Sequence, residues 1–377
     1  MVQIMAGIYI HIPFCKQKCS YCDFHFSTTY KSYEDKMIDA LCKELELRSV
    51  DTKEIIQTIY FGGGTPSLLS TASLGKILNT IYKNYILNPE LELSLEANPD
   101  DITVENVLSW EKYGINRLSI GIQSFDSQDL IWMNRAHSAE ESIHAVKIAQ
   151  DNGISNISID LIYGLPNMDE NRWKKQIQIA NSLDVKHISA YCLTIEEKTK
   201  LNQLVKSKSI VPANNDMQAR HFEILQEELK KVGFIQYEIS NFGKENFFSK
   251  HNSSYWKGEV YLGIGPSAHS FDGYTRSWNI ANNALYIAGI DTNKRNVTSE
   301  LLSAKDNFNE YLLIGLRTIW GVSLSKLNTI IPLNDAFYAK VKVLLKEEKA
   351  FIKEDDFVLS DKGMLFADAI ALDLFED

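Results

Sequence analysis

Three cysteines near the start of the chain have the spacing of a cluster-binding loop. Cys15, Cys19 and Cys22 are separated by three and then by two residues. Three thiolates from one short loop can bind three irons of a [4Fe-4S] cluster and leave the fourth iron open to an outside ligand. Lys16 and Lys18 lie in the same loop and are expected to offset part of the negative charge of thiolates and sulfides. We therefore predict an iron-sulfur site at these cysteines.

A zinc site with His25 as a fourth ligand, or a chance grouping, is the alternative for the same loop. Zinc motifs usually arrange their ligands as two separated pairs, and this loop does not. The chain holds five cysteines, and this odd number argues against a disulfide framework. The two others, Cys42 and Cys192, are predicted to be packing residues, because buried free cysteine usually behaves as a small hydrophobe.

Residues suited to a polar ligand stand at the ends of four predicted strands. After one strand comes a run of glycines and a threonine, which contains Gly63, Gly64 and Thr65. Glycines let a ligand approach the backbone closely. Three further apolar strands end in polar side chains, namely Glu96, Gln123 and Asp160. A carboxylate at the end of an apolar strand needs a partner, so these residues are either hydrogen-bonded within the protein or in contact with a ligand.

The elements that must position these residues alternate between strand and helix patterns up to about Gly233. The strand patterns cover residues 7–12, 55–61, 91–97, 117–122, 156–162 and 187–193. Helical periodicity lies between them, most clearly over 33–48, and Ser138 with Glu141 predicts a capping box for another helix. Parallel strands need helix-length connections, so this order predicts an α/β fold with a parallel sheet and helices outside it.

We expect three parts along the chain. Residues 1–233 form the α/β part with the cysteine loop, residues 234–300 form a covering region of loops and short strands, and residues 301–377 form a small C-terminal α+β domain. The last part reads as three helices, a hairpin at 351–359 and a final helix, which is the order of a winged helix. It carries 9 Lys and Arg against 13 Asp and Glu, a balance of −4 that argues against a DNA reader.

Charge and hydropathy limit the partners of the whole chain. It has 39 Lys and Arg against 49 Asp and Glu, a formal charge of −10, so no global positive field attracts nucleic acid or an anionic membrane surface. No apolar run approaches the roughly 18 residues of a membrane span, and the first residues lack the pattern of a secretory signal. We therefore expect a cytoplasmic protein with a small ligand and with no nucleic-acid partner.

With Tyr21 before its last cysteine, the loop resembles the C-x3-C-aromatic-C signature of the radical S-adenosylmethionine superfamily. The flanking YIHIPFC resembles the coproporphyrinogen oxidase-like branch. The resemblance implies a partial (β/α)6 TIM-like barrel, a [4Fe-4S] cluster, and S-adenosylmethionine that binds the open iron and yields a 5′-deoxyadenosyl radical. It also implies an electron donor of the flavodoxin or ferredoxin type. The positions implied in contacts to S-adenosylmethionine are Tyr9, Tyr21, Gly63, Gly64, Thr65, Glu96, Gln123, Arg135 and Asp160.

His11 lies two residues after Tyr9 in the first predicted strand. Side chains alternate along a strand, so the two residues are expected to face the same side. His11 is therefore either a candidate catalytic residue near the cofactor or a satisfied interior histidine.

The coproporphyrinogen oxidase-like branch contains both oxidases and haem chaperones. Two differences from the oxidases and one motif indicate which group this chain resembles. The oxidases carry another cysteine two positions after the third cluster cysteine, where this chain has Phe24, and a long segment before the cluster, where this chain has fourteen residues. His251, Tyr255 and Trp256 fit the HNxxYW motif of HemW-type haem chaperones. The resemblance therefore implies a protein that binds haem or a related porphyrin at this motif and hands haem to an acceptor protein.

Imidazole ligates haem iron and flat rings pack on porphyrin, so a histidine beside two aromatic residues suits a haem site. The same residues could instead anchor a loop on the barrel. His269 is a second haem candidate, or a wall of the cofactor site. Two other functions remain open. One is an oxygen-independent coproporphyrinogen III oxidase, which carries out an oxidative decarboxylation, and the other is a zinc-bearing binding module without radical chemistry.

Overall fold

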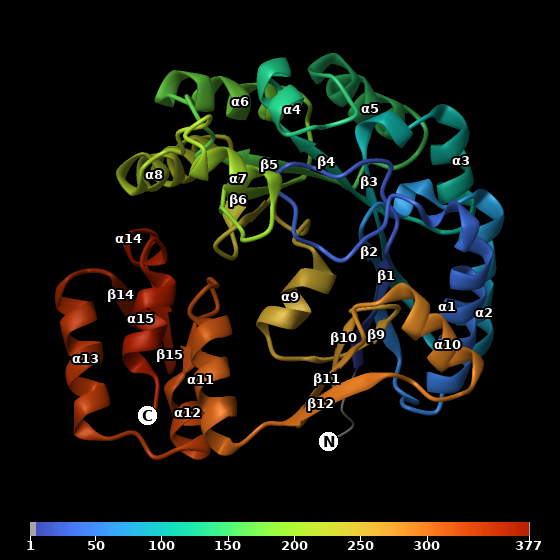
Figure 1. Ribbon diagram of the computed structural model, residues 1–377. Helices are drawn as coiled ribbons and strands as arrows, with labels where there is room; N and C mark the ends of the chain where they lie inside the picture. The colour runs from blue at the N-terminus through green and yellow to red at the C-terminus, as the bar shows by residue number, and fades with distance from the viewer. Residues whose placement is uncertain (1–4, 377) are drawn as a thin grey trace.

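A curved, open sheet dominates the computed structural model, which describes residues 5–376 (Figure 1). Its twelve strands have the order β12-β11-β10-β9-β1-β2-β3-β4-β5-β6-β8-β7. The strands β1 to β6 pair in parallel, and one or more helices follow each of them. They are β1 (Met5–Ile12), β2 (Ile56–Gly63), β3 (Leu87–Ala97), β4 (Arg117–Gln123), β5 (Ile157–Tyr163) and β6 (His187–Cys192). The predicted α/β fold with six β/α units is confirmed.

Most of the connecting helices lie on the outer side of these strands, whereas α7 (Lys200–Lys206) lies near β6 and bonds the cysteine loop through Leu201 N and Ser20 O (Figure 1). The connecting helices are α1 (Glu34–Arg48), α2 (Thr71–Asn84), α3 (Val104–Lys112), α4 (Ser127–Trp132), α5 (Ala139–Asp151), α6 (Glu170–Ser182), α7 and α8 (Asn215–Lys231), with 3-10 turns at Tyr30–Ser32, Pro66–Leu68 and Pro99–Asp101. The predicted capping box opens α5, where Ser138 and Glu141 bond each other's backbone N–H groups. Within residues 5–376 no helix combines the length and apolar composition needed to cross a bilayer.

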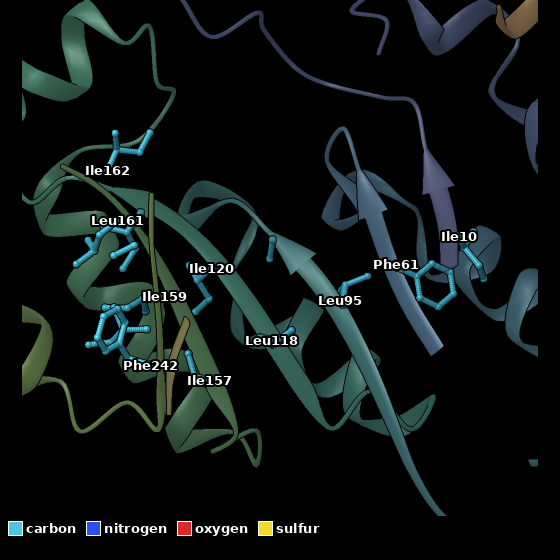
Figure 2. Packing of buried hydrophobic residues seen from close by; sticks show 14 of the residues in the cluster. Ile10, Phe61, Leu95, Leu118, Ile120, Ile157, Ile159, Leu161, Ile162 and Phe242 are labelled. Atoms are coloured by element: carbon cyan, nitrogen blue, oxygen red, sulfur yellow. The ribbon is translucent and has the colours of Figure 1, made fainter. Parts of the chain in front are cut away.

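The two faces of the sheet differ in chemistry because side chains alternate along each strand. On β1 the residues Ile8, Ile10 and Ile12 are fully buried and join the apolar cluster that contains Met37 and Leu41 of α1. Figure 2 shows the same cluster continuing through Phe61, Leu95, Leu118, Ile120, Ile157 and Ile159 on the next strands. The inner face instead carries polar and aromatic side chains, which leaves it suited to bind ligands.

Residues 234–300, which we expected to be loops and short strands, extend both edges of the sheet. They contain β7 (Ile235–Gln236), β8 (Asn241–Gly243), α9 (Lys250–Trp256), β9 (Val260–Ile264), β10 (His269–Phe271), β11 (Thr275–Asn279), α10 (Asn283–Asp291) and most of β12 (Val297–Leu301). The strand β9 pairs in parallel with β1, and β8 pairs antiparallel with β6. These additions satisfy the backbone groups of strands that would otherwise be exposed edges. Helix α9 lies inside the curve of the sheet (Figure 1).

The C-terminal part has the predicted order of three helices, a hairpin and a final helical segment. Its elements are α11 (Ala304–Gly315), β13 (Val322–Ser323), α12 (Leu324–Ile330), α13 (Asp335–Lys346), β14 (Ala350–Lys353), β15 (Asp356–Leu359), α14 (Asp361–Met364) and α15 (Ala367–Leu374). Backbone hydrogen bonds from Ile239 N to Arg317 O (3.0 Å) and from Ile319 N to Tyr237 O (3.1 Å) join it to the segment after β7.

Candidate functional site

A cavity of about 620 Å³ opens at the carboxyl ends of the parallel strands. Loops at these ends carry different residues without disturbing the strands, so ligand sites of parallel α/β folds commonly form there. Most of the residues predicted from the sequence line this one cavity. They are Cys15, Cys19, Tyr21, Cys22, Gly63, Gly64, Thr65, Glu96, Gln123, Arg135 and Asp160.

Backbone hydrogen bonds hold the cysteine loop over the cavity. Cys15 N donates to Ser27 O at 3.1 Å, and Ser20 N donates to Met133 O at 2.9 Å, which ties the loop to the segment after α4. Lys16 lines the same cavity as the cysteines, and its ammonium pairs with Asp100 and Asp101.

The charged group that reaches the cysteines is Arg135. Its Nη1 donates to Cys19 Sγ at 3.4 Å, while its Nη2 donates to Asn98 Oδ1 and to Gly121 O, each at 2.7 Å. Thr65 Oγ1 donates to Cys15 Sγ at 3.5 Å. Donors of this kind stabilise thiolates bound to iron.

The three thiols fit a cluster better than a single metal ion. Burial raises the pKa of Cys15 and that of Cys22 to about 11, so these thiols keep their protons until a metal displaces them. Within residues 5–376 no three Cys, His, Asp or Glu side chains are arranged around one ion. Cluster thiolates bind separate irons, whereas zinc draws its ligands to one centre. His25, the fourth ligand of the zinc alternative, instead bonds Asn283 Oδ1 through Nε2 at 2.7 Å.

The glycine run at the end of β2 lets the chain approach the segment that leads into the cysteine loop. A Cβ on Gly64 would lie 2.5 Å from Phe14 O and 2.9 Å from Ile12 O, and both are backbone atoms of the segment that leads into the cysteine loop. Gly63 has a φ of +109°, and a Cβ there would lie 2.6 Å from the ring of His11. The sequence suggested that these glycines make room for a ligand. The structure adds that they make room for the chain itself.

Two buried carboxyl groups in the cavity wall, Glu96 and Asp160, are close enough for one to raise the pKa of the other. Burial and then Asp160 raise the pKa of Glu96 to about 7, although Tyr60 donates to its Oε1 at 2.9 Å. Burial raises the pKa of Asp160 to about 6, and Ser119 Oγ donates to it at 3.2 Å. The hydroxyl donors of the protein only partly compensate the burial of these two carboxyl groups. A ligand with a cationic or hydroxyl group would therefore stabilise their ionised forms.

Gln123 ends β4 at the edge of the cavity with a φ of +70°. A left-handed conformation is uncommon for a residue that is not glycine, and strained residues of this kind concentrate at ligand sites. The register between β4 and β5 shifts just before Gln123, which re-aims its side chain toward the cavity it lines.

Tyr9 and His11 face the same side of β1, as predicted, but lie outside the cavity lining. Tyr9 OH and His11 Nδ1 are 3.2 Å apart, and His11 Nε2 bonds His25 O at 2.9 Å. Burial lowers the pKa of His11 to about 4, so the ring is neutral near pH 7. With both ring nitrogens engaged, His11 has the geometry of a satisfied interior histidine.

The HNxxYW segment lies in α9, which packs on β1 and β2. His251 is 1% exposed. Its Nδ1 bonds Thr58 Oγ1 at 2.7 Å, and its Nε2 bonds Tyr255 OH at 2.8 Å. Arg317 of the C-terminal part covers the ring of Trp256 at 5.5 Å. In this structure both ring nitrogens of His251, the predicted haem ligand, are therefore hydrogen-bonded.

The structure adds cavity residues that the sequence did not single out. Asn98, Tyr191 and Cys192 all line the cavity. Asn98 could have been predicted from the sequence. It follows Glu96 by two residues, and side chains two positions apart along a strand face the same side. Cys192, predicted to be a packing residue, ends β6 and is only partly buried. Nothing in its local sequence distinguished it from a core cysteine.

Comparison with known proteins supports both the fold and the family. The sequence model described as the radical SAM superfamily matches residues 9–178. The chain is similar to "Heme chaperone HemW" of Bacillus subtilis, with 36% identity over 331 residues and 85% of each chain covered. It is also similar to "Heme chaperone HemW" of Mycobacterium tuberculosis, with 31% identity over 369 residues, 97% of this chain and 93% of the relative.

Among solved structures, coproporphyrinogen III oxidase (HemN) from Escherichia coli, described as a radical SAM enzyme, has a similar fold. Its TM-score is 0.84, at 22% identity, over 99% of this chain and 90% of that one. This likeness establishes the fold alone, whereas the identity to the two HemW sequences extends over most of both chains. The chain therefore belongs to the HemW family of radical SAM proteins.

Proposed function

We propose that the protein is a haem chaperone of the radical S-adenosylmethionine type. Cys15, Cys19 and Cys22 bind a [4Fe-4S] cluster, the cavity binds S-adenosylmethionine, and the protein holds haem before handing it to an acceptor protein. The observation that carries the proposal is the cavity, which gathers the three cysteines with the carboxyl groups of Glu96 on β3 and Asp160 on β5. The relatives named heme chaperone HemW support the haem part.

The side chains of the cavity set the environment of both groups. Thr65 and Arg135 donate hydrogen bonds to the sulfurs, and Glu96 and Asp160 offer acceptors to the ammonium and hydroxyl groups of S-adenosylmethionine. The cluster and S-adenosylmethionine together supply one-electron chemistry, with a protein of the flavodoxin or ferredoxin type as the electron source.

The cluster is tested by anaerobic reconstitution with iron and sulfide. We expect about four irons per chain and broad absorption near roughly 400 nm. Cys15→Ser should abolish both, and the matched control Cys42→Ser, which alters a buried cysteine of α1, should leave both unchanged. A protein that takes up zinc with no iron and develops no such absorption contradicts the proposal.

The cofactor site is tested by binding S-adenosylmethionine to the reconstituted protein. Asp160→Asn removes a charged acceptor from the cavity wall, and we expect its affinity to fall about tenfold or more. Asp151→Asn removes an exposed carboxylate at the end of α5 and should bind as tightly as the unaltered protein. Equal affinities for the two variants would show that the ligand binds elsewhere.

Haem handling is tested with the reconstituted full chain. We expect a Soret band on mixing with haem, and transfer of that haem to a haem-free b-type cytochrome added afterwards. The oxidase alternative predicts the opposite pattern, in which coproporphyrinogen III is decarboxylated anaerobically and no haem is retained. That result would show that the protein is an oxidase and would contradict the proposed chaperone function.

A further inference from the structure

A tyrosine on the inner face of β2 touches both the cavity wall and helix α9. Tyr60 is 8% exposed, and its OH donates to Glu96 Oε1 at 2.9 Å. Glu96 lines the cavity that also contains the three cysteines. The ring of Tyr60 stacks on that of His251, with centroids 5.0 Å apart and planes 18° apart. Tyr60 therefore contacts a cavity residue with its hydroxyl and the HNxxYW motif with its ring.

Tyr9 is the third member of this group of rings. It pairs with Tyr60 across the neighbouring strands β1 and β2, so both side chains face the same side of the sheet. Its ring centroid lies 6.2 Å from that of Tyr60 and 6.4 Å from that of His251, with planes 19° and 25° apart. Aromatic rings attract each other at such distances. We call Tyr9, Tyr60 and His251 the ring stack.

Gly62 leaves the space in which the ring stack meets the cavity wall. A Cβ at this position would lie 2.9 Å from Tyr9 Cε2, 3.0 Å from Tyr60 Cε1 and 3.1 Å from Glu96 Oε1. Ordinary contacts of a Cβ begin at 3.4 Å, so all three groups would have to move. The missing side chain therefore lets two rings and the carboxyl group come together.

The sheet holds the His251 ring at one nitrogen and at one face. Its Nδ1 bonds Thr58 Oγ1 at 2.7 Å, and Thr58 lies on β2 two residues before Tyr60. Its Nε2 bonds Tyr255 OH at 2.8 Å, and this partner belongs to α9 itself. If haem binds at the motif, we expect Nε2 to exchange its partner for iron. Thr58 and Tyr60 would then keep the imidazole oriented, as the outer partners of metal-bound histidines do.

A ligand that binds Glu96 should also restrict the ring stack. A carboxylate has two oxygens with about four acceptor sites, so Glu96 can accept from a ligand and from Tyr60 together. A ligand that fixes this carboxylate also fixes the Tyr60 hydroxyl, and with it the ring on which His251 stacks. A second ligand that needs an ordered imidazole then loses less conformational entropy on binding.

We infer that Tyr60 is a positioning residue that couples the cavity to the HNxxYW motif, so that S-adenosylmethionine in the cavity and haem at α9 strengthen each other's binding. The inference rests on the proposed function and adds the link between its two ligands. The coupling acts through hydrogen bonds and ring packing alone, and it transfers no electron and breaks no covalent bond.

The coupling is tested by titrating haem into the reconstituted full chain with and without saturating S-adenosylmethionine. We expect S-adenosylmethionine to tighten haem binding by about fivefold or more. Haem should tighten the binding of S-adenosylmethionine by the same factor, because coupling between two binding sites is reciprocal. Equal haem affinities with and without S-adenosylmethionine overturn the inference.

The role of Tyr60 is tested with two matched variants. Tyr60→Phe keeps the ring and removes the hydroxyl, so both ligands should still bind while the coupling factor falls to about one. Tyr85→Phe is the control, because Tyr85 is also 8% exposed and its OH donates to Leu45 O at 2.8 Å within the apolar core cluster. This control should keep the full coupling factor. Full coupling in Tyr60→Phe would show that Tyr60 does not link the two sites.

Amide hydrogen exchange gives a second readout that needs no haem. S-adenosylmethionine should slow exchange in α9 of the unaltered protein and of Tyr85→Phe, and should leave it unchanged in Tyr60→Phe. Helix α13 of the C-terminal part serves as the internal reference and should not respond in any of the three proteins. An α9 whose exchange is the same with and without bound S-adenosylmethionine contradicts the coupling.

The outcomes separate this inference from the proposed function. If the unaltered protein binds both ligands independently of each other, the proposed function stands and the coupling is wrong. If it binds no haem, the chaperone proposal fails and the haem half of the inference fails with it. The exchange measurement then still decides whether Tyr60 links the cavity to α9.

Discussion

At the scale of single residues, the cavity depends on Gly64, because this position has no room for a side chain. Gly64 N donates to Ile12 O at 2.9 Å, and a Cβ on Gly64 would stand 2.5 Å from Phe14 O. Both neighbours are backbone atoms, so no side-chain rotation can relieve the contact. The loop after β2 and the cysteine loop can therefore lie together only if this position has no side chain.

Gly64→Ala should lower the free energy of unfolding by about 1–3 kcal/mol, the usual cost of forcing an extra carbon into a packed site. It should also lower the iron content after reconstitution, because the cysteine loop must shift. Gly258→Ala is the comparison, since its Cβ meets only Ile314 at 3.6 Å and its cost comes from a φ of +66° alone. Urea unfolding and iron analysis measure both effects. Full iron content in Gly64→Ala would mean that the loops can separate without loss.

The raised pKa of Glu96 gives the protein a measurable pH dependence. The folded pKa of about 7 lies above the ordinary value of 4.5, so between these values the folded protein binds more protons than the unfolded chain. The free energy of unfolding should therefore fall as pH rises from about 5 to 7. Glu96→Gln should remove a fall on the order of 3 kcal/mol over this range.

Buried histidines change the free energy of unfolding with pH in the opposite direction. Comparing Glu96→Gln with the unaltered protein separates the contribution of Glu96 from theirs. His11 has a lowered pKa of about 4, so its contribution to stability is lost as pH falls, and it is common to both proteins. Urea unfolding at pH 5, 6 and 7 measures the slopes, with the exposed Glu46→Gln as control. Parallel slopes for Glu96→Gln and the unaltered protein would show that Glu96 is already ionised at pH 5.

At the scale of elements, one buried carboxylate joins α1 to the strands added beside β1. Glu44 is 0% exposed and accepts from Asn279 Nδ2 of β11 at 2.9 Å, from Tyr286 OH of α10 at 2.7 Å and from Gly265 N at 2.9 Å. Arg295 Nε lies 3.3 Å from the same group. Because its partners come from separate elements, Glu44 holds the loop after β9 against the outer helix.

Glu44→Ala should lower the free energy of unfolding by about 3–5 kcal/mol, because it leaves the half-buried Arg295 and several buried donors without their acceptor. Tyr286→Phe removes one of these bonds and should cost about 1–2 kcal/mol. Glu46→Ala alters an exposed carboxylate two residues further along α1 and should stay within about 0.5 kcal/mol. Urea unfolding gives all three values. Equal costs for Glu44→Ala and Glu46→Ala would rule out a structural role for the buried group.

At the scale of the whole molecule, the C-terminal part is attached to the sheet through a short segment. The bridge between Glu238 and Thr318 continues the backbone contacts of this segment, and Arg317 covers the ring of Trp256 at 5.5 Å. Arg317 also pairs with Asp368 of α15. The same arginine therefore connects α9, inside the curve of the sheet, to the last helix of the chain.

Arg317→Ala should loosen the C-terminal part without unfolding the sheet, because it removes the contacts of this arginine with Trp256 and Asp368. Amide hydrogen exchange should speed up in α11 and α15 and stay unchanged in β1 to β6. Lys305→Ala, an exposed change in α11, is the control. Unchanged exchange in Arg317→Ala would show that the backbone bridge and the other contacts, such as the ion pairs Lys230–Asp361 and Arg276–Glu310, hold the two parts together without Arg317.

Local spacing made much of the cavity predictable. The cysteines and Tyr21 lie within eight positions, and most of the other predicted cavity residues lie in or directly after strands, whereas Arg135 follows α4. Parallel strands bring their carboxyl ends to one edge of a sheet, so residues far apart in the chain meet there without further information. The partners of Lys16 were not predictable in the same way, because Asp100 and Asp101 reach it from the loop after β3.

The sequence by itself determined the cysteine loop, the six β/α units and the ligand edge of the sheet, because each depends on short-range spacing and on strand order. Only the tertiary structure decided which histidines are buried and which are exposed. His251 is held by Thr58, 193 positions away in the chain, while His269 stacks on Trp278 across a hairpin and stays exposed. The burial of a side chain depends on all the elements packed around it, and a motif contains only its own residues.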